Sequence, residues 1–187
     1  EESPSMRSRK VEGIKKLARL LVKVEKPSEI EALLARMEEI PQLYKGNKGY
    51  AFEVLSPEGD CILIHAEDDI KDLKKVEEEV TFSKDEKLRY LTAFEISVEI
   101  NLPDKTSSLL DKEEIENRLA FNQAQGSDLL VENNVTWDLS MLKFQVENLD
   151  LPVLRQRFEE AGYFIPKSEK FFLTKDTNNI ELWFEAV

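Results

Sequence analysis

Hydrophobic and polar residues alternate with a period of two in many short stretches, and turn residues separate these stretches. This is the pattern of β-strands with one buried face. The longest alternation has Phe94, Ile96 and Val98 on one side of the strand. The same pattern predicts strands at residues 17–24, 43–44, 50–55, 61–65, 93–102, 120–123, 129–131, 135–137, 142–146, 171–173 and 180–184.

Other stretches follow the helical period, with apolar residues three and four positions apart. The first helix is expected after Pro27, where Ser28 and Glu31 form the pattern of a capping box. The second is expected at residues 105–119. The third should start after Asp150, a good N-cap residue. Residues 66–90 contain nine acidic residues and predict one loosely packed helix inside a charged connector.

The C-terminal residues predict a β-hairpin around the turn 176–179, whose Asp and Asn residues favour turns. Glu181 and Trp183 should share one face of its second strand. The carboxylate of Glu181 is either a ligand or catalyst directed into a cavity, or a solvated group on the wet side of the sheet. Trp183 and Trp137 either belong to the core or line a ligand-binding cup with Glu181.

The order of elements repeats along the chain. A strand, a helix and further strands at residues 22–56 return at residues 144–176 with nearly the same spacing. Residues 93–137 have the same order, so the pattern indicates three βαβββ units in an α+β protein. The expected organisation is half of a first domain at residues 1–66, a charged connector at 67–91 and a complete second domain at 92–187.

Three βαβββ units and the turn Asp176-Thr-Asn-Asn-Ile-Glu-Leu182 resemble the vicinal-oxygen-chelate superfamily, which has the glyoxalase-like fold. Within it, longer segments are similar to the CppA family, whose members are named as complement-degrading proteinases. These segments are Glu2–Met6, Leu43–Gly46, Ile64–Ile70, Val135–Phe144 and Tyr163–Phe171. The resemblance implies two curved mixed sheets with outer helices, and a further unit ahead of residue 1 that this sequence does not contain.

The resemblance implies a proteinase that degrades the third complement component, a host protein. The alternative is a metal-free binding module of the same fold, for a small ligand or a protein partner.

The resemblance also locates the superfamily's metal site. Glu181 stands at the position of a metal-binding glutamate, but Leu63 and Ser97 stand where partner ligands would be expected. The chain has a single histidine, so a site of two histidines and one carboxylate cannot form within it. We therefore expect no bound metal and no cofactor, although carboxylates alone remain an open alternative for Mg²⁺ or Ca²⁺.

His65 is the only imidazole available for a proteolytic mechanism, and Cys61 precedes it by four residues. On one strand the two would lie on the same face but ~13 Å apart, at ~3.3 Å per residue. A nucleophile and its base need about 3 Å. A Ser–His pair that uses His65 stays open, as does an ordinary structural role. The catalytic candidates are His65, Cys61 and Glu181, and the ligand-binding candidates are Glu181, Trp183, Ser97 and Trp137.

The net charge of the chain limits the kinds of partner that it is suited to bind. The 187 residues carry a net charge of −12, although the first 24 carry seven Lys and Arg against three Glu. An acidic chain is unsuited to nucleic acid, and no apolar run is long enough to cross a membrane. No signal peptide is visible, which favours the cytoplasm, whereas a role against complement would require secretion or the cell surface.

A single βαβββ unit leaves one apolar face of its sheet open. In the first unit this face should carry Phe52, Val54, Ile62 and Ile64. Exposure of four such side chains costs on the order of 6–12 kcal/mol. We therefore expect another chain, or the missing N-terminal unit, to cover residues 11–66.

Overall fold

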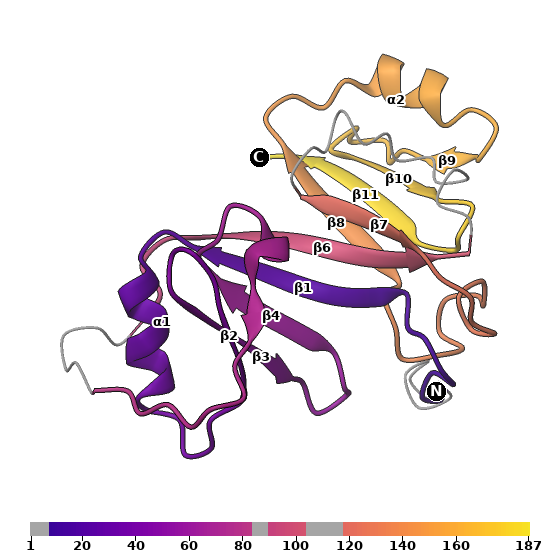
Figure 1. Cartoon of the computed structure of the whole chain (residues 1–187). Helices are drawn as coiled ribbons and strands as arrows, with labels where there is room; N and C mark the ends of the chain where they lie inside the picture. Colours follow the sequence, from indigo (N-terminus) through magenta and orange to yellow (C-terminus); the bar gives the residue numbers. More distant parts are fainter. Residues whose placement is uncertain (1–7, 84–89, 104–117) are drawn as a thin grey trace. The chain divides into compact units, whose positions relative to one another are not determined.

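The structure is a computed structural model that describes residues 8–83, 90–103 and 118–187. Within these residues it confirms an α+β protein with two mixed sheets and few helices, which is consistent with the glyoxalase-like fold (Figure 1). The described strands follow the order β5-β2-β3-β4-β1-β6-β7 in the larger sheet and β8-β11-β10-β9 in the smaller one.

The larger sheet is formed by β1 (Leu17–Val24), β2 (Gln42–Lys45), β3 (Tyr50–Leu55), β4 (Cys61–His65), β5 (Lys74–Lys75), β6 (Phe94–Leu102) and β7 (Leu119–Gln123). The smaller sheet is formed by β8 (Met141–Val146), β9 (Tyr163–Phe164), β10 (Phe171–Lys175) and β11 (Glu181–Ala186). The helices are α1 (Pro27–Leu34), the short 3-10 helix η2 (Ile70–Asp72) and α2 (Leu151–Arg157).

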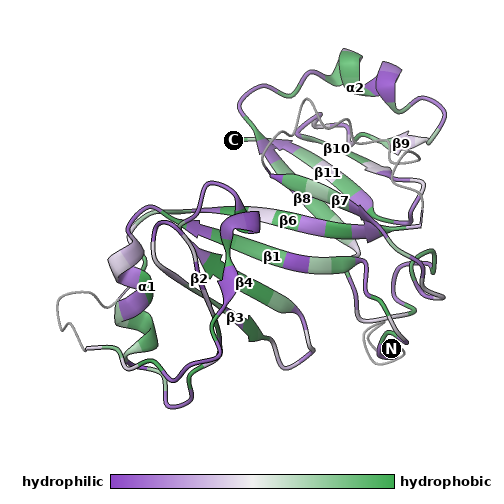
Figure 2. Ribbon diagram, viewed as in Figure 1, coloured by the Kyte–Doolittle hydropathy of each residue, from purple (hydrophilic) through white to green (hydrophobic). Residues whose placement is uncertain are grey.

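The chain divides into two compact units. What we call the N-terminal unit contains residues 18–99, and the C-terminal unit contains residues 121–187 together with the chain up to Leu17. In the N-terminal unit, β1 pairs with β4 in parallel, while β2, β3 and β4 pair as an antiparallel meander. Figure 2 shows hydrophobic residues along β1, β3 and β4.

Helix α1 covers one face of the N-terminal sheet. Its Ile30 and Leu34 are buried against Phe52 of β3 and Leu43 of β2. Val54 and Ile64 pack against the same cluster. The expectation that Phe52 and its neighbours lie on an open sheet face is therefore wrong, because the helix of the same unit already buries this side of the sheet.

The C-terminal unit has an aromatic core. The ring of Phe172 on β10 lies 5.8 Å from that of Phe158 after α2, and the Phe144 and Phe184 rings stack at 5.0 Å. Asp150 caps α2 by accepting a hydrogen bond from the Val153 amide, as predicted. The predicted C-terminal hairpin is also confirmed, and Asn179 closes its turn with a φ of 61°.

Helix α1 begins differently from its prediction. Its N-cap is Lys26, and no side chain caps it, so the capping box of Ser28 and Glu31 does not form. Buried Glu29 instead accepts hydrogen bonds from the amide and hydroxyl of Thr92, at 2.9 and 2.6 Å. This long-range contact fixes the first turn of the helix and lowers the pKa of Glu29.

The connector also differs from its prediction. Where a helix was expected, the chain forms η2 and then β5, which pairs with β2 and forms one edge of the larger sheet. The amide of Val76 continues this pairing by donating to the Leu43 carbonyl at 3.0 Å. Without β5, strand β2 would have unpaired backbone N–H and C=O groups on its outer side. Pairing with β5 satisfies these groups, whereas a short, highly charged helix would not.

The middle βαβββ pattern is only partly realised. Strands β6 and β7 follow β1 in the larger sheet. The strands expected at 129–131 and 135–137 are turns, apart from one bridge between Arg9 and Thr136. Most of the helix expected at 105–119 lies outside the described residues.

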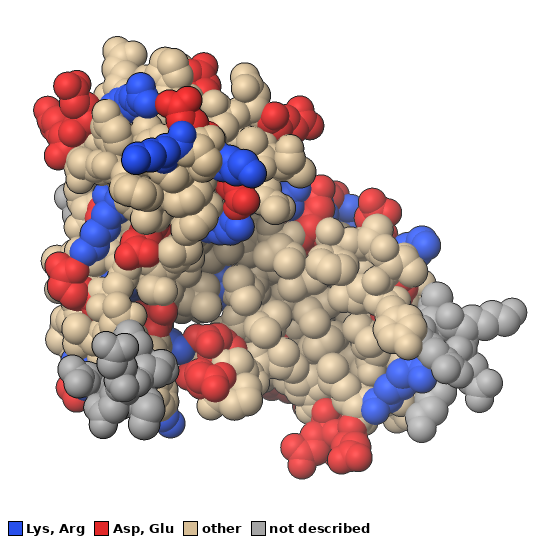
Figure 3. All heavy atoms as spheres, turned by 180° about the vertical axis from the view of Figure 1, so that it is seen from behind, with Lys and Arg blue, Asp and Glu red and all other residues tan. Residues whose placement is uncertain are grey.

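The basic N-terminal stretch contacts this region of turns. Arg9 donates to both carboxylate oxygens of buried Asp128, at 2.7 and 2.6 Å, and the Glu12 amide donates to the same carboxylate. Lys16 is buried and donates from its ammonium to the Val131 carbonyl at 3.0 Å. Arg9 therefore neutralises a carboxylate of its own unit, and Lys16 binds a carbonyl of the same unit. On the face in Figure 3, Lys and Arg lie among Asp and Glu.

The contact between Arg9 and Asp128 should make stability depend on pH. The hydrogen bonds from Arg9 lower the pKa of Asp128 to about 2. A lowered pKa stabilises the fold above the unfolded-state value of about 4, and this contribution disappears as the pH falls toward 2. Asp128→Asn should therefore be less stable than wild type at pH 6 and nearly equal at pH 2, measured by urea unfolding. Exposed Glu160→Gln is the control, and an equal loss at both pH values would contradict the prediction.

Candidate functional site

A pocket of about 410 Å³ opens on one face of the larger sheet, in the N-terminal unit. Helix α1 covers the opposite face of this sheet. Strands β1, β4 and β6 contribute to it, together with the segment that follows β4. Its lining residues are Leu21, Lys23, His65, Asp68, Asp69, Ile70, Glu95 and Ser97. It contains the only histidine of the chain and a serine 32 positions further along the sequence.

The sheet register places His65 in this pocket. His65 is the last residue of β4 and lies beside Lys23 of β1. The chain then turns through Glu67, whose buried carboxylate accepts a hydrogen bond from the Lys48 amide at 2.6 Å. Gly46 permits this approach, because a Cβ at this position would lie only 2.5 Å from the Glu67 side chain. The contact fixes the segment that carries the acidic residues of the pocket.

The imidazole of His65 is in an unusual state. Only 4% of the residue is exposed, and its Nδ1 has no hydrogen-bond partner among the described residues. Burial lowers the pKa of His65 below its ordinary value, so the ring is neutral at pH 7. A neutral imidazole has one nitrogen that accepts a proton. His65 is therefore equipped to act as a general base or as a hydrogen-bond partner of a ligand.

The charges around His65 are partly compensated. Asp68 accepts from Lys23 at 2.9 Å and forms an ion pair with Lys48 at 2.7 Å. These two lysines lower the pKa of Asp68 to about 2. Asp69 caps η2 by accepting from the Lys71 amide. The pocket therefore combines a neutral base, a hydroxyl group and anchored charges.

Cys61 lies at the other end of β4 and does not line the pocket. Burial and the neighbouring Glu53 raise the pKa of its thiol to about 11. The thiol is therefore protonated at neutral pH and is a poor nucleophile. The beginning of the strand instead lies beside a bidentate ion pair of Arg19 with Glu99, at 3.0 and 3.2 Å.

The remaining candidates lie in the C-terminal unit. Glu181 lines a separate, open pocket of about 260 Å³ with Phe164, Leu173 and Lys175. Trp183 lies on the same face of β11 and stacks on Phe171 at 4.2 Å. Trp137 is 43% exposed, and its amide donates to the Arg9 carbonyl. Ser97 and Glu181 therefore line different pockets.

Within the described part of the chain, no group of three or more His, Cys, Asp or Glu residues has the arrangement of a metal site. Leu63, at the position where the resemblance implied a metal ligand, is buried in a small cluster with Leu21 and Ala51. Its side chain therefore packs in the core. No described helix has the length and hydrophobicity needed to cross a membrane.

Sequence reasoning identified His65 and Ser97 but treated them as separate candidates. It missed Lys23 and Glu95, which also line the pocket. The alternation of β1 and β6 was a usable signal, because Lys23 shares a face with Leu21, and Glu95 shares a face with Ser97. The pairing of these strands around His65 was the missing information.

The two mixed sheets and their few helices define a glyoxalase-like α+β protein with a histidine-containing pocket in its N-terminal unit. The family description CppA N-terminal matches residues 1–76, and CppA C-terminal matches residues 91–184. A crystal structure of the cppA protein from Streptococcus pneumoniae TIGR4 is 61% identical, with a TM-score of 0.93 over 100% of this chain and 79% of that chain. The chain belongs to the CppA family. No curated protein matches it.

Proposed function

We propose that the chain is a hydrolase that cleaves a protein substrate, and that its reacting centre is the pocket around His65. The family resemblance implies the third complement component as this substrate. The observation that carries the proposal is that the imidazole of His65, the only one in the chain, lines an open pocket and is kept neutral by burial. A general base with a pKa near or below neutral pH can accept a proton from an attacking group.

The proposed attacking group is a water molecule that His65 activates. Ser97 on β6 is separated from His65 on β4 by strand β1, about 10 Å at the backbone, whereas a nucleophile and its base need about 3 Å. The hydroxyl of Ser97 lines the same pocket, where it would hydrogen-bond the substrate. His65 would take a proton from the water as its oxygen attacks the peptide carbonyl, and would later protonate the leaving amine. Cys61 is unsuited to the role of attacking group because its thiol remains protonated.

The test is incubation of the purified chain with purified third complement component, followed by electrophoresis and mass spectrometry of the fragments. His65→Gln should slow cleavage about 100-fold or more, the usual contribution of a general base. Cys61→Ala is the matched control on the same strand and should cleave normally.

The Ser97→Ala variant distinguishes two catalytic mechanisms, one with a serine nucleophile and one with a water nucleophile. If this variant loses cleavage together with His65→Gln, the serine is the nucleophile. If only His65→Gln loses cleavage, His65 activates a water molecule. Equal cleavage by wild type and His65→Gln, prepared identically, would exclude the proposed centre and indicate a contaminating proteinase.

A second candidate is a binding module that holds a protein or small ligand without cleaving it. The protonated thiol of Cys61 and the apolar Leu63 at a ligand position favour it. Binding of intact complement protein in surface plasmon resonance, with no fragments after prolonged incubation, would support this candidate over hydrolysis.

A further inference from the structure

A second hollow in the N-terminal unit, here called the acidic groove, shares no lining residue with the His65 pocket. It has a volume of about 560 Å³ and lies between residues 40–43 and residues 76–81. Both segments border the edge of the sheet, where β5 pairs with β2. The groove therefore begins where this pairing ends.

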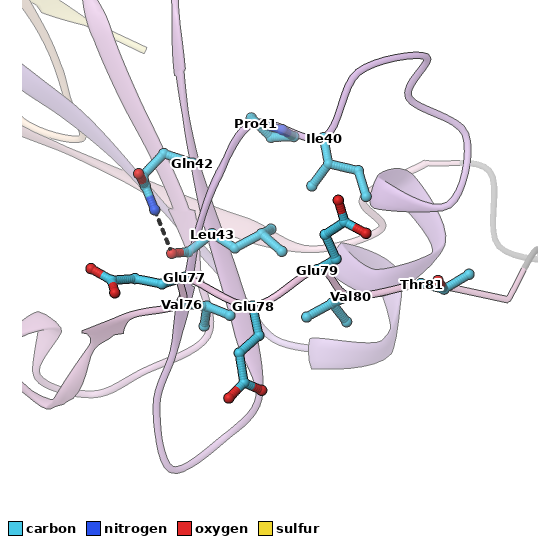
Figure 4. Close-up of a pocket in the computed structure, with 10 residues that line it drawn as sticks. All are labelled: Ile40, Pro41, Gln42, Leu43, Val76, Glu77, Glu78, Glu79, Val80 and Thr81. Carbon is cyan, nitrogen blue, oxygen red and sulfur yellow. Dashed lines mark hydrogen bonds between the residues drawn. The ribbon is translucent and has the colours of Figure 1, made fainter.

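Apolar side chains form one part of the groove wall. Leu43 is buried in the core cluster, and Val76 and Val80 pack against that cluster. Ile40 is 49% exposed. In Figure 4 the side chains of Ile40, Leu43 and Val80 point toward a shared space. An inserted apolar side chain would reach this space and bury the exposed part of Ile40.

Three consecutive carboxylates border the same space. Glu77, Glu78 and Glu79 are exposed, and none of them has an ion pair or side-chain hydrogen bond within the described residues. Figure 4 shows the carboxylate of Glu79 pointing toward Ile40, while Glu77 and Glu78 extend outward. The described residues that line the groove include three Glu but no Lys or Arg. The charge of this described lining is therefore complementary to a cationic ligand.

The backbone provides a further point of attachment. The bond from the Val76 amide to the Leu43 carbonyl is the last backbone hydrogen bond between the two segments in the described part of the chain. Beyond it, residues 77–80 line the groove opposite Pro41 and Gln42 and form no backbone hydrogen bond with another described residue. Free amide and carbonyl groups at a sheet edge can pair with an extended peptide.

We propose that the acidic groove binds an extended segment of a protein partner in which a large apolar side chain is flanked by Lys or Arg. The apolar side chain lies among Ile40, Leu43 and Val80. The flanking cations pair with Glu77, Glu78 and Glu79, which also accelerate association at low salt. This binding does not require hydrolysis at His65.

The test uses a fluorescein-labelled octapeptide with two adjacent leucines between lysines, measured by fluorescence anisotropy with the full chain at 50 mM salt. The combined change Glu77→Gln, Glu78→Gln and Glu79→Gln should weaken binding about tenfold, from three exposed ion pairs. The matched control changes Glu147, Glu159 and Glu160 to Gln. It removes the same charge from exposed positions of the C-terminal unit and should bind like wild type.

Ile40→Ser tests the apolar part without changing the charge. Because Ile40 is half exposed, this variant should fold while it binds the peptide several-fold more weakly. A peptide with serines in place of the leucines should also bind more weakly. Absent binding by wild type, or equal weakening by both glutamine triples, would overturn the proposal. Dimerisation that Ile40→Ser abolishes in analytical ultracentrifugation would also overturn it, because a second copy would then occupy the groove.

Discussion

Replacing Phe172 with alanine is expected to destabilise the C-terminal unit by about 3–5 kcal/mol, the usual cost at a buried phenylalanine. Phe172 is fully buried, and the rings of Phe158 and Tyr163 lie 5.8 and 5.1 Å from its own. The substitution removes apolar surface from the core and leaves a cavity. Since a domain is stable by only about 5–15 kcal/mol, this loss is a large fraction of the total.

Urea unfolding, monitored by tryptophan fluorescence, measures the free energy of unfolding of the unit that contains Phe172. Both tryptophans of the chain, Trp137 and Trp183, belong to the C-terminal unit. Phe164→Ala is the matched control on the neighbouring strand β9, because Phe164 is 56% exposed. It should cost less than about 1 kcal/mol. Equal costs for the two alanine variants would show that Phe172 is not the centre of this core.

The second large effect is expected for Phe52→Ala in the N-terminal unit, again about 3–5 kcal/mol. Phe52 is fully buried and joins β3 to Ile30 and Leu34 of α1. Without its ring, the helix loses its main contact with the sheet. Hydrogen exchange followed by mass spectrometry should show faster exchange of the amides in α1 and β3.

Leu55→Ala is the control for this second experiment. Leu55 ends the same strand but is 68% exposed, so its removal should leave exchange in α1 unchanged. Comparable effects of the two substitutions would contradict the described packing of Phe52. The expected partner, another chain or the missing N-terminal unit that covers residues 11–66, is not tested by this packing and stays a prediction.

The sequence by itself determined the local elements. Alternation identified the strands later found at 50–55 and 61–65, because period two follows from a strand with one buried face. The turn at 176–179 was also local, since Asn179 tolerates its positive φ. The aspartate that caps α2 was recognisable because it lies next to the amides it satisfies.

Only the tertiary structure decided which distant residues meet. The predicted capping box does not form because the helix begins at Pro27, so Ser28 lies inside its first turn. The first turn is held instead by Thr92, 63 positions away, which donates two hydrogen bonds to Glu29. Residues 129–137, where strands were expected, form turns next to Asp128, which Arg9 binds across 119 positions. His65 and Ser97 share a pocket because β1, which pairs with β4, also neighbours β6 in the sheet. Alternation shows that a strand has a buried face but does not identify its neighbour, because pairing depends on hydrogen bonds between distant segments.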